Sequence, residues 1–351
     1  MRVLVTGGSG FLGSAACRAL ARAGHAVIAL TRQPELARIR IGNPEVEIVR
    51  GSIGDPVEVA RAAEGAAWLI HAAGIAARDA PSRVLRWVHI AGTENVLRAA
   101  RRAGVRRVIH VSCADVSLSD EDRMHWDEAR ALPRAPVGQH ARTKLIAEEL
   151  ALAASDDVIE VTALRPALLW GTDDVDGLAA FIQAMRSGAF TLYGGGRNIV
   201  ATTHIDNFVR AVLLAAQAEA APGRTYYVTD GEFLEAREFY ARLAAALALP
   251  APKTGGSLPL ALLGARMRDL ARATDGAARA AVVRVGRSAL FDVSRATLDL
   301  GYEAKVALEP CFAELRAWIE AAGGADRLLA RARPRPVEAD VDTQVRAAGG
   351  D

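Results

Sequence analysis

The feature that most constrains the fold of this chain is a glycine-rich turn close to its first residue. An apolar run at 3–6 leads directly into Gly7-Gly-Ser-Gly10-Phe-Leu-Gly13, and an amphipathic stretch follows to Ala23. Glycines at these spacings let the backbone turn tightly and approach a phosphate without an intervening Cβ. The helix N-terminus then offers free N–H groups and the positive end of its dipole to that phosphate. A strand, this turn and a helix in succession predict a dinucleotide-binding unit.

Short apolar runs alternate with longer amphipathic stretches through the first half of the chain. Runs typical of buried strands lie at 3–6, 26–30, 46–49, 68–71, 108–112 and 159–164. Stretches with helical periodicity lie between them, at 13–23, 56–64, 82–103 and 141–154. This order predicts an α/β fold of the Rossmann type, a doubly wound parallel sheet covered by helices on both faces.

The alternation ends after Pro166, which indicates a second part of the chain. Loop signals occur at 173–177 and 193–196, helices are predicted at 206–218 and 236–249, and a strand is predicted at 225–229. We expect residues 1–165 to form the dinucleotide-binding domain, to which the chain returns at about 196–218. Residues 166–325 are then a smaller, mostly helical substrate-binding lobe. The composition of 326–351 predicts a disordered tail.

Composition excludes several classes of protein. The chain has 351 residues, of which 51% are hydrophobic, enough for a large buried core. Its 43 basic and 41 acidic residues give a net charge of +2, so no nucleic-acid partner is expected. The three widely spaced cysteines, Cys17, Cys113 and Cys311, indicate a reducing compartment rather than a disulfide framework. Because no Cys/His pattern has zinc-ligand spacing, no metal site is predicted.

Two observations bear on localisation. The first residues run directly into a strand, without a basic and then apolar leader. Apolar stretches such as 258–263 are much shorter than the roughly 20 residues that span a bilayer. We therefore expect a soluble, cytoplasmic protein without a membrane partner.

The end of the second predicted strand bears on the choice of dinucleotide. In NAD-selective folds of this kind, an acidic residue about 20 positions after the glycines binds the ribose 2′-hydroxyl. Here the strand ends Leu30-Thr-Arg32, with no Asp or Glu. Arg32 could instead bind a 2′-phosphate in a bidentate manner. The sequence therefore favours NADP over NAD, and the alternative is that Arg32 is only an exposed loop residue.

Further motifs along residues 1–322 resemble the extended short-chain dehydrogenases/reductases, in particular the branch of epimerases/dehydratases and 3β-hydroxysteroid-dehydrogenase-like proteins. The matching segments begin with the glycine turn and continue with 51–55, 70–74, 92–97, 164–166, 170–171, 193–200, 204–207, 291–296 and 300–302. The resemblance implies that these residues bind the dinucleotide: Gly7, Gly10, Phe11, Leu12, Gly13, Arg32, Ser52, Ile53, Ala72, Ala73, Gly74, Lys144 and Pro166. Ser52 stands where the family usually has an Asp.

The resemblance also implies where the chemistry occurs. In that family a Ser or Thr binds the substrate oxygen, a Tyr transfers the proton, and a Lys four residues later binds the nicotinamide ribose. This chain keeps Lys144, but His140 stands in the place of the Tyr and Cys113 in that of the Ser or Thr. No Tyr occurs before Tyr193. The candidate catalytic residues are therefore His140, Lys144 and Cys113.

Positions four apart on a helix share a face, so His140 and Lys144 are both expected to face the cofactor. Positive charge on Lys144 and on an oxidised nicotinamide favours a neutral imidazole, which accepts a proton better than it donates one. The alternative is that His140 is a polar filler in a site without activity. Cys113 is a candidate nucleophile, although a small buried filler is the simpler interpretation. Asp115 is the best acidic candidate to orient a group in the pocket.

Three functional hypotheses remain open from the sequence. The first is an NAD(P)-dependent oxidoreductase that acts on a hydroxyl/carbonyl pair of a small-molecule substrate. The second is a redox-neutral lyase, cyclase or isomerase on the same scaffold, and the third is a non-catalytic dinucleotide-binding protein. Trp126 and Trp170 are either pocket-lining or core residues. The resemblance further implies a homodimer formed through the helices at 82–103 and 141–154.

Overall fold

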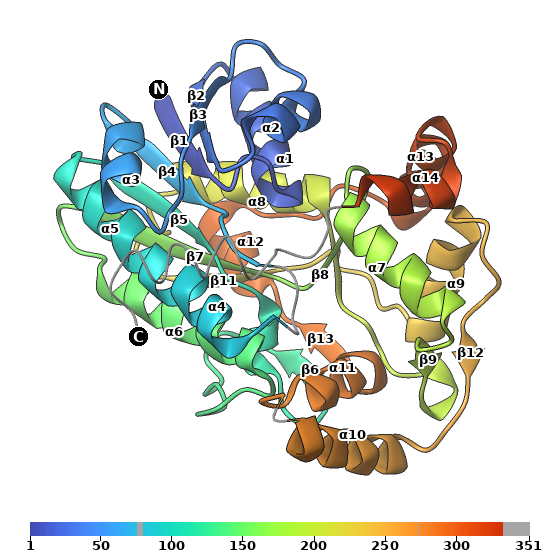
Figure 1. The fold of residues 1–351 in the computed structure, drawn as a ribbon. Coiled ribbons are helices and arrows are strands. Elements are labelled where there is room, and N and C mark those ends of the chain that lie inside the picture. Colours follow the sequence, from blue (N-terminus) through green and yellow to red (C-terminus); the bar gives the residue numbers. More distant parts are fainter. Residues whose placement is uncertain (76–79, 273, 333–351) are drawn as a thin grey trace.

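A computed structural model describes residues 1–75, 80–272 and 274–332. Its centre is a parallel sheet of seven strands in the order β11-β7-β5-β4-β1-β2-β3 (Figure 1). The strands are β1 (Arg2–Thr6), β2 (Ala26–Thr31), β3 (Glu47–Arg50), β4 (Trp68–His71), β5 (Arg107–Val111), β7 (Glu160–Pro166) and β11 (Thr225–Val228). The Rossmann-type fold class is confirmed, and the six strands expected in the first half all occur within two residues of their predicted bounds.

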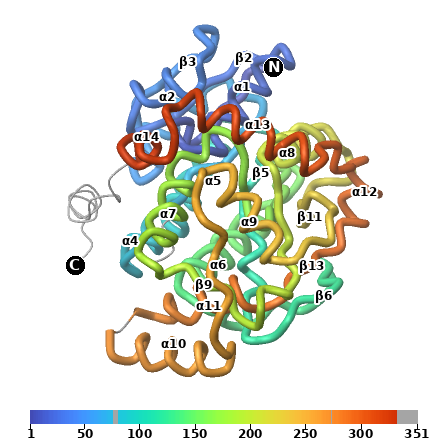
Figure 2. Tube along the Cα trace, turned by 90° about the vertical axis from the view of Figure 1, so that its right-hand side faces the viewer, coloured from blue at the N-terminus to red at the C-terminus, as the bar shows by residue number. Residues whose placement is uncertain are grey.

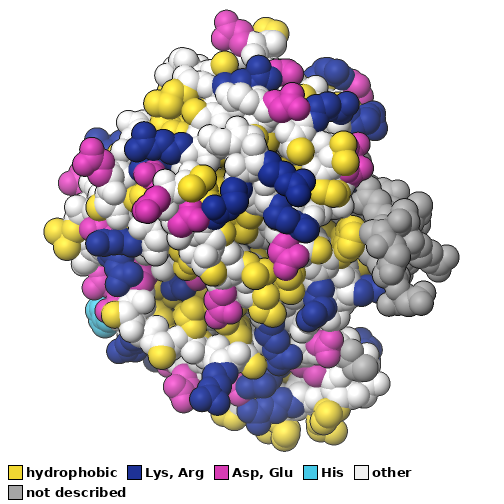
Figure 3. Space-filling model, turned by 90° about the vertical axis from the view of Figure 1, so that its left-hand side faces the viewer, with side chains coloured by type: hydrophobic (Ala, Val, Ile, Leu, Met, Phe, Trp, Pro, Cys, Tyr) yellow, Lys and Arg dark blue, Asp and Glu magenta, His cyan; other side chains and the backbone are white. Residues whose placement is uncertain are grey.

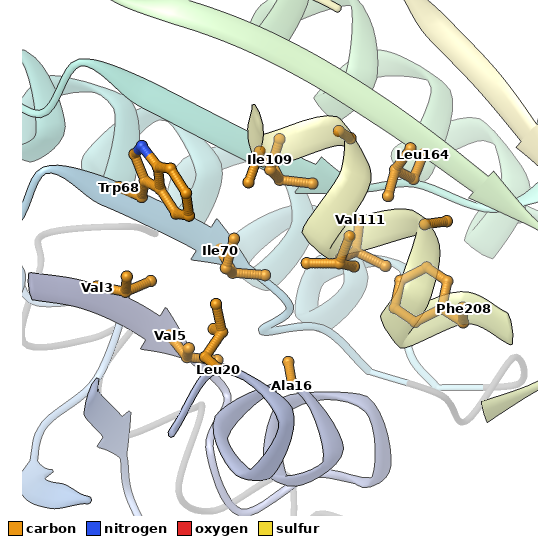
Figure 4. Packing of buried hydrophobic residues seen from close by; sticks show 14 of the residues in the cluster. Val3, Val5, Ala16, Leu20, Trp68, Ile70, Ile109, Val111, Leu164 and Phe208 are labelled. Carbon is orange, nitrogen blue, oxygen red and sulfur yellow. The ribbon is translucent and has the colours of Figure 1, made fainter. Parts of the chain in front are cut away.

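Helices cover both faces of this sheet. On one face lie α1 (Phe11–Arg22), α2 (Pro34–Ile41) and α8 (Ile205–Gln217), and on the other lie α3 (Pro56–Ala63), α5 (Gly92–Arg102) and α6 (Gln139–Ala153). Successive side chains of a strand point to opposite faces. Val3 and Val5 therefore pack with Leu20 and Phe208 on the α1/α8 side (Figure 4), whereas Leu4 packs on the other side.

The helix expected at 82–103 is interrupted. It consists of α4 (Ser82–Arg86), one π-helical turn, η1 (Trp87–Ala91), and then α5. Such turns insert an extra residue into a helix and occur often at functional sites. The turn contains His89, whose buried ring hydrogen-bonds to the backbone at Ile75 and to Thr143 of α6. We attribute the interruption to these contacts.

The second part of the chain forms a lobe with two ends (Figure 2). At one end α7 (Val175–Arg186), α9 (Ala236–Ala246), α13 (Leu308–Ala321) and α14 (Gly324–Arg331) surround a core that includes Trp170, Phe239 and Phe312. At the other end lie α10 (Leu258–Arg272) and α11 (Ala277–Gly286). Three two-stranded pairs complete the described strands: β8 (Leu168–Trp170) with β10 (Thr202–His204), β9 (Thr191–Leu192) with β12 (Lys253–Thr254), and β6 (Arg123–Trp126) with β13 (Ala289–Phe291).

Two sequence expectations about this part need correction. The chain returns to the main domain beyond 196–218, because β11 pairs with β7 and α12 (Ser294–Leu300) packs on α8 and β11. The expected disordered tail is wrong for residues 326–331, which belong to α14. Leu328 of that helix is buried in the lobe core, and its burial explains the helix. The remainder of the predicted tail, 333–351, lies outside the described residues.

Two further features concern the expected partners of the protein: the charge of its surface and the length of its helices. Acidic and basic side chains are interspersed over the face shown in Figure 3. In the part of the chain that the structure describes, no helix is both long enough and apolar enough to cross a membrane.

A buried ion pair fixes α6 to the sheet. The Arg165 guanidinium at the end of β7 donates to both carboxylate oxygens of Glu148, from Nε to Oε2 at 2.9 Å and from Nη2 to Oε1 at 2.5 Å. The two side chains are only 6% and 2% exposed. Glu148 lies one helical turn after Lys144, so the pair determines which face of α6 is turned toward the strands.

We expect Glu148→Ala to destabilise the protein by about 3–5 kcal/mol, because it leaves Arg165 buried without its charged partner. The free energy of unfolding in urea measures this effect. Glu149→Ala, at the exposed neighbouring position, is the matched control and should change it by less than about 0.5 kcal/mol. Replacing both partners, by Glu148→Leu and Arg165→Met, should recover much of the loss. Equal effects of E148A and E149A would contradict this role of the pair.

A second prediction concerns acid stability. Burial lowers the pKa of His71 to about 3 and that of His110 well below its ordinary value, and Lys144 adds to both effects. Between the ordinary value of 6.5 and these lowered values, the unfolded chain binds protons that the folded chain does not. Stability is therefore present above pH 6.5 and is lost as the pH falls, by at most about 1.4 kcal/mol per pH unit for each histidine.

His110→Leu should reduce this loss. Both ring nitrogens of His110 are buried and have no hydrogen-bond partner among the described residues, so a leucine removes an acid-sensitive group without removing a bond. The urea midpoint of H110L should fall less between about pH 7 and about pH 5 than that of the unaltered protein. His125→Asn, at an exposed position with positive φ, is the control. Parallel pH profiles of H110L and the unaltered protein would refute the explanation.

Candidate active site

The glycine-rich turn lies at the carboxyl end of β1, where the strand order reverses between β1 and β4. Gly7 has φ +76°, and a Cβ there would approach the Cα of Ala73 to 2.8 Å. A Cβ on Gly13 would lie only 2.2 Å from the carbonyl oxygen of Gly7. Gly10 directly precedes α1 as its N-cap. The fold therefore requires glycine at positions 7 and 13, and it brings the start of α1 against the segment that follows β4.

The other residues expected to bind the dinucleotide lie along the same edge of the sheet. Phe11 and Leu12 form the first turn of α1, and Ala72, Ala73 and Gly74 directly follow β4. The Ala73 amide donates to Thr6 Oγ1 at 3.2 Å, which ties the ends of β1 and β4 together. Pro166 is buried as the last residue of β7. The structure thus brings these residues to one edge, and their roles in binding stay predictions.

The segment after β3 is fixed by local bonds. Ser52 accepts a bond from the Gly54 amide at 3.2 Å through its hydroxyl, and its own amide donates to Glu58 Oε2 at 2.7 Å. The Ile53 side chain packs against Gly92 of α5. Both polar groups of Ser52 are therefore used to hold this turn, and its role in binding the dinucleotide stays a prediction.

Two arginines lie near the end of β2. Arg32 is exposed directly after the strand, as expected. Sequence reasoning missed Arg40, whose Nη1 donates to the carbonyl oxygen of Ser9 in the glycine turn at 2.9 Å. The same guanidinium is 3.6 Å from Asp176 of α7, so it links the turn to the second lobe. The α2 helix that carries Arg40 was not predicted, although Pro34 at its start and Gly42 at its end are typical helix boundary signals.

Lys144 and His140 lie one turn apart on α6, as the sequence predicts. The Lys144 ammonium donates to the carbonyl oxygen of Val111, the last residue of β5, at 2.5 Å. Burial lowers the pKa of Lys144, while the charges of Cys113 and Glu148 act in the opposite direction. The amine is therefore held at the end of the central strands.

The tautomer of His140 follows from its hydrogen bond. The ring is 7% exposed, and its Nε2 lies 3.1 Å from the carbonyl oxygen of Ile75. Because a carbonyl oxygen only accepts, Nε2 carries a proton, and in the neutral ring Nδ1 then carries the lone pair. Nδ1 is thus the atom of His140 that can accept a proton or ligate an ion.

Three further histidines surround Lys144, and sequence reasoning missed them. His71 and His110 are paired residues on β4 and β5, with ring centroids 5.4 Å apart. The His89 ring lies edge-on to His140 at 5.2 Å. Burial lowers the pKa of all three, and the charge of Lys144 lowers each further. They are therefore neutral at physiological pH. The signal in the sequence was one histidine in each of two consecutive apolar runs, His71 in 68–71 and His110 in 108–112.

Cys113 and Asp115 lie close to His140. Each is partly buried, and one donor atom from each lies within 4.8 Å of the other and of a ring nitrogen of His140. Asp115 Oδ2 accepts a bond from Arg284 Nε of α11 at 2.7 Å. The structure thus brings the candidate residues Cys113, Asp115 and His140 together. Cys/His spacing did not predict this cluster, because its members come from segments 25 residues apart.

The two tryptophans considered as pocket-lining or core residues differ in their surroundings. Trp170 is 3% exposed, stacks on Phe312 with ring centroids 4.5 Å apart, and donates to Asp230 at 2.9 Å. It is therefore a core residue of the second lobe. Trp126 is half-buried, and the guanidinium of Arg130 covers its ring.

Comparison with known proteins agrees with this geometry. Residues 3–229 match the model of the NAD dependent epimerase/dehydratase family. Over 261 residues the chain is 35% identical to a 2-alkyl-3-oxoalkanoate reductase of Stenotrophomonas maltophilia (strain K279a), covering 71% of this chain and 77% of the relative. Over 312 residues it is 31% identical to a 4-hydroxy-2-methyl-3-oxo-4-farnesyl-3,4-dihydroquinoline-1-oxide ketoreductase of Stigmatella aurantiaca, covering 87% and 93%.

Solved structures show the same fold. The structure of MoeE5 in complex with UDP-glucose and NAD superposes with a TM-score of 0.70 at 24% identity, over 92% of this chain and all of that one. The family model spans well over half of the chain. The chain belongs to the NAD-dependent epimerase/dehydratase family of extended short-chain dehydrogenases/reductases.

Proposed function

We propose that this protein is an NAD(P)-dependent oxidoreductase that acts on a hydroxyl/carbonyl pair of a small-molecule substrate, with His140 and Lys144 in place of the family's Tyr and Lys. The observation that carries the proposal is the buried His140, which presents a lone pair at Nδ1 one helical turn before Lys144. The two reductases similar to this chain support chemistry at a carbonyl group, one acting on a 3-oxoalkanoate and one on an oxo-dihydroquinoline.

The roles of the two side chains follow from their charges. The bound dinucleotide supplies or accepts the hydride. In alcohol oxidation, Nδ1 of His140 accepts the hydroxyl proton as the hydride leaves the carbon, and in reduction it returns a proton to the oxygen. Lys144 is anchored at β5 and contributes a positive charge beside the nicotinamide ribose. Because that charge disfavours an imidazolium, the arrangement favours proton acceptance over donation.

NADP is the dinucleotide that the end of β2 fits better. The strand ends at Thr31, whose hydroxyl donates to Ser9 of the glycine turn at 2.8 Å. Arg32 is exposed directly beyond it, without a neighbouring carboxylate in the sequence. A guanidinium at this place suits a 2′-phosphate, whereas a free 2′-hydroxyl has no acidic partner there.

Replacing His140 tests its proton-transfer role. His140→Ala should lower kcat/KM for a responsive ketone or alcohol by about 10²–10⁴-fold, the usual contribution of a positioned acid or base. His140→Tyr restores the family's group and should retain more activity than H140A. The change in absorbance of the reduced nicotinamide gives the rate, and the exposed His125→Asn is the control. Unchanged turnover by H140A would refute the role, and product formation without net cofactor consumption would favour the redox-neutral alternative.

Arg32 sets the expected preference between dinucleotides. Arg32→Ala should weaken NADP binding by roughly tenfold or more, as expected for loss of a charge-assisted hydrogen bond, and leave NAD binding unchanged. Calorimetric titration with each dinucleotide measures both affinities. Arg38→Ala, at an exposed arginine on α2 paired with Glu35, is the matched control. If R32A binds NADP as tightly as the unaltered protein does, Arg32 is only an exposed loop residue.

A further inference from the structure

Three different kinds of metal-binding side chain converge where the turn after β5 meets the start of α6. The sulfur of Cys113, a carboxylate oxygen of Asp115 and a ring nitrogen of His140 all lie within 4.8 Å of one another. Cys113 and Asp115 come from the turn that follows β5, and His140 comes from the start of α6. The cluster is therefore held between the central sheet and one helix.

We propose that Cys113, Asp115 and His140 bind a divalent transition-metal ion, with Zn²⁺ the best match. Thiolate, imidazole and carboxylate are the three side-chain ligand types of zinc. The thiolate disfavours Mg²⁺ and Ca²⁺, which prefer oxygen ligands only. Three protein ligands leave a fourth tetrahedral position, and zinc sites with this arrangement bind water or a substrate oxygen there.

The surroundings of two ligands support the assignment. A metal-binding histidine almost always donates its second ring N–H to a carbonyl or carboxylate, which fixes the tautomer. His140 makes this bond, from Nε2 to the carbonyl oxygen of Ile75, and so keeps the lone pair on Nδ1. The Asp115 carboxylate is likewise oriented, by the Arg284 guanidinium at 2.7 Å. Both bonds hold ligand groups in place before an ion arrives.

The charge balance sets the expected strength of binding. A thiolate and a carboxylate together neutralise a divalent ion. The nearby cations Lys144 and Arg284 oppose binding, although Lys144 is also held by the Val111 carbonyl and faces Glu148. We therefore expect binding weaker than that of closed structural zinc sites, which lack such neighbouring cations.

The catalytic consequence rests on the proposed function, whereas ion binding itself does not. An ion held by these three residues would polarise a substrate oxygen bound at its open position. His140 would then carry the ion, and a water molecule would exchange the proton with the substrate oxygen. The metal-free protein would use Nδ1 of His140 for that proton, as proposed above.

Titration with Co²⁺ as a spectroscopic probe of the zinc site tests the proposal. The full chain, first treated with a chelator, should develop a thiolate-to-cobalt charge-transfer band and strong visible bands of tetrahedral Co²⁺ that saturate at one equivalent. Zn²⁺ should displace these bands. Cys113→Ser should abolish the charge-transfer band, and His140→Ala and Asp115→Asn should weaken Co²⁺ binding at least tenfold. Cys311→Ser, at a buried cysteine of the second lobe, and His125→Asn should leave the bands unchanged.

The outcomes separate this proposal from the proposed function. Absence of a band at one equivalent, or a charge-transfer band that survives in C113S, would overturn the metal site. Calorimetric titration of the same samples with NADP provides the second readout and verifies that each variant is folded. NADP-dependent turnover in a protein that binds no Co²⁺ would reject the metal site and leave the oxidoreductase standing. One-to-one Co²⁺ binding without any dinucleotide binding would support the metal site and reject the oxidoreductase.

Discussion

The rest of the site depends on how α6 is fixed against the sheet. His140, Lys144 and Glu148 are spaced by single helical turns and contact two strands of the central sheet and the segment that follows a third. Glu148 pairs with Arg165 at the end of β7, Lys144 donates to the end of β5, and His140 donates to the segment that follows β4. Because the Glu148–Arg165 pair is almost fully buried, rotation of the helix would leave charges without partners in a low-dielectric interior.

This constraint holds the candidate catalytic side chains of α6 in fixed positions. Lys144 is held at the end of β5, and His140, Cys113 and Asp115 lie together. Burial and the charge of Lys144 keep His71, His89 and His110 neutral, so these rings add no positive charge near Lys144. Arg284 reaches Asp115 from α11, and the second lobe thereby contributes to the charge of the pocket.

Local patterns were enough to predict the sheet, the glycine turn and the shared face of His140 and Lys144, because each depends on residues close in sequence. The contacts that the sequence did not predict are all tertiary. The π-helical turn at Trp87–Ala91 depends on the partners of His89 on other segments. The approach of Arg284 to Asp115 joins residues 169 positions apart. The burial of Leu328 makes a helix where composition indicated disorder.

In the proposed mechanism, His140 transfers the proton in place of the family's Tyr, next to a dinucleotide bound as in the family. A crystal structure of the protein with bound NADP tests this mechanism most directly. The account predicts that Lys144 Nζ contacts the nicotinamide ribose and that the imidazole of His140 faces the reactive side of the nicotinamide ring. The adenosine 2′-phosphate should lie beside Arg32. A nicotinamide ring bound away from α6, or separated from His140 by other side chains, would contradict the account.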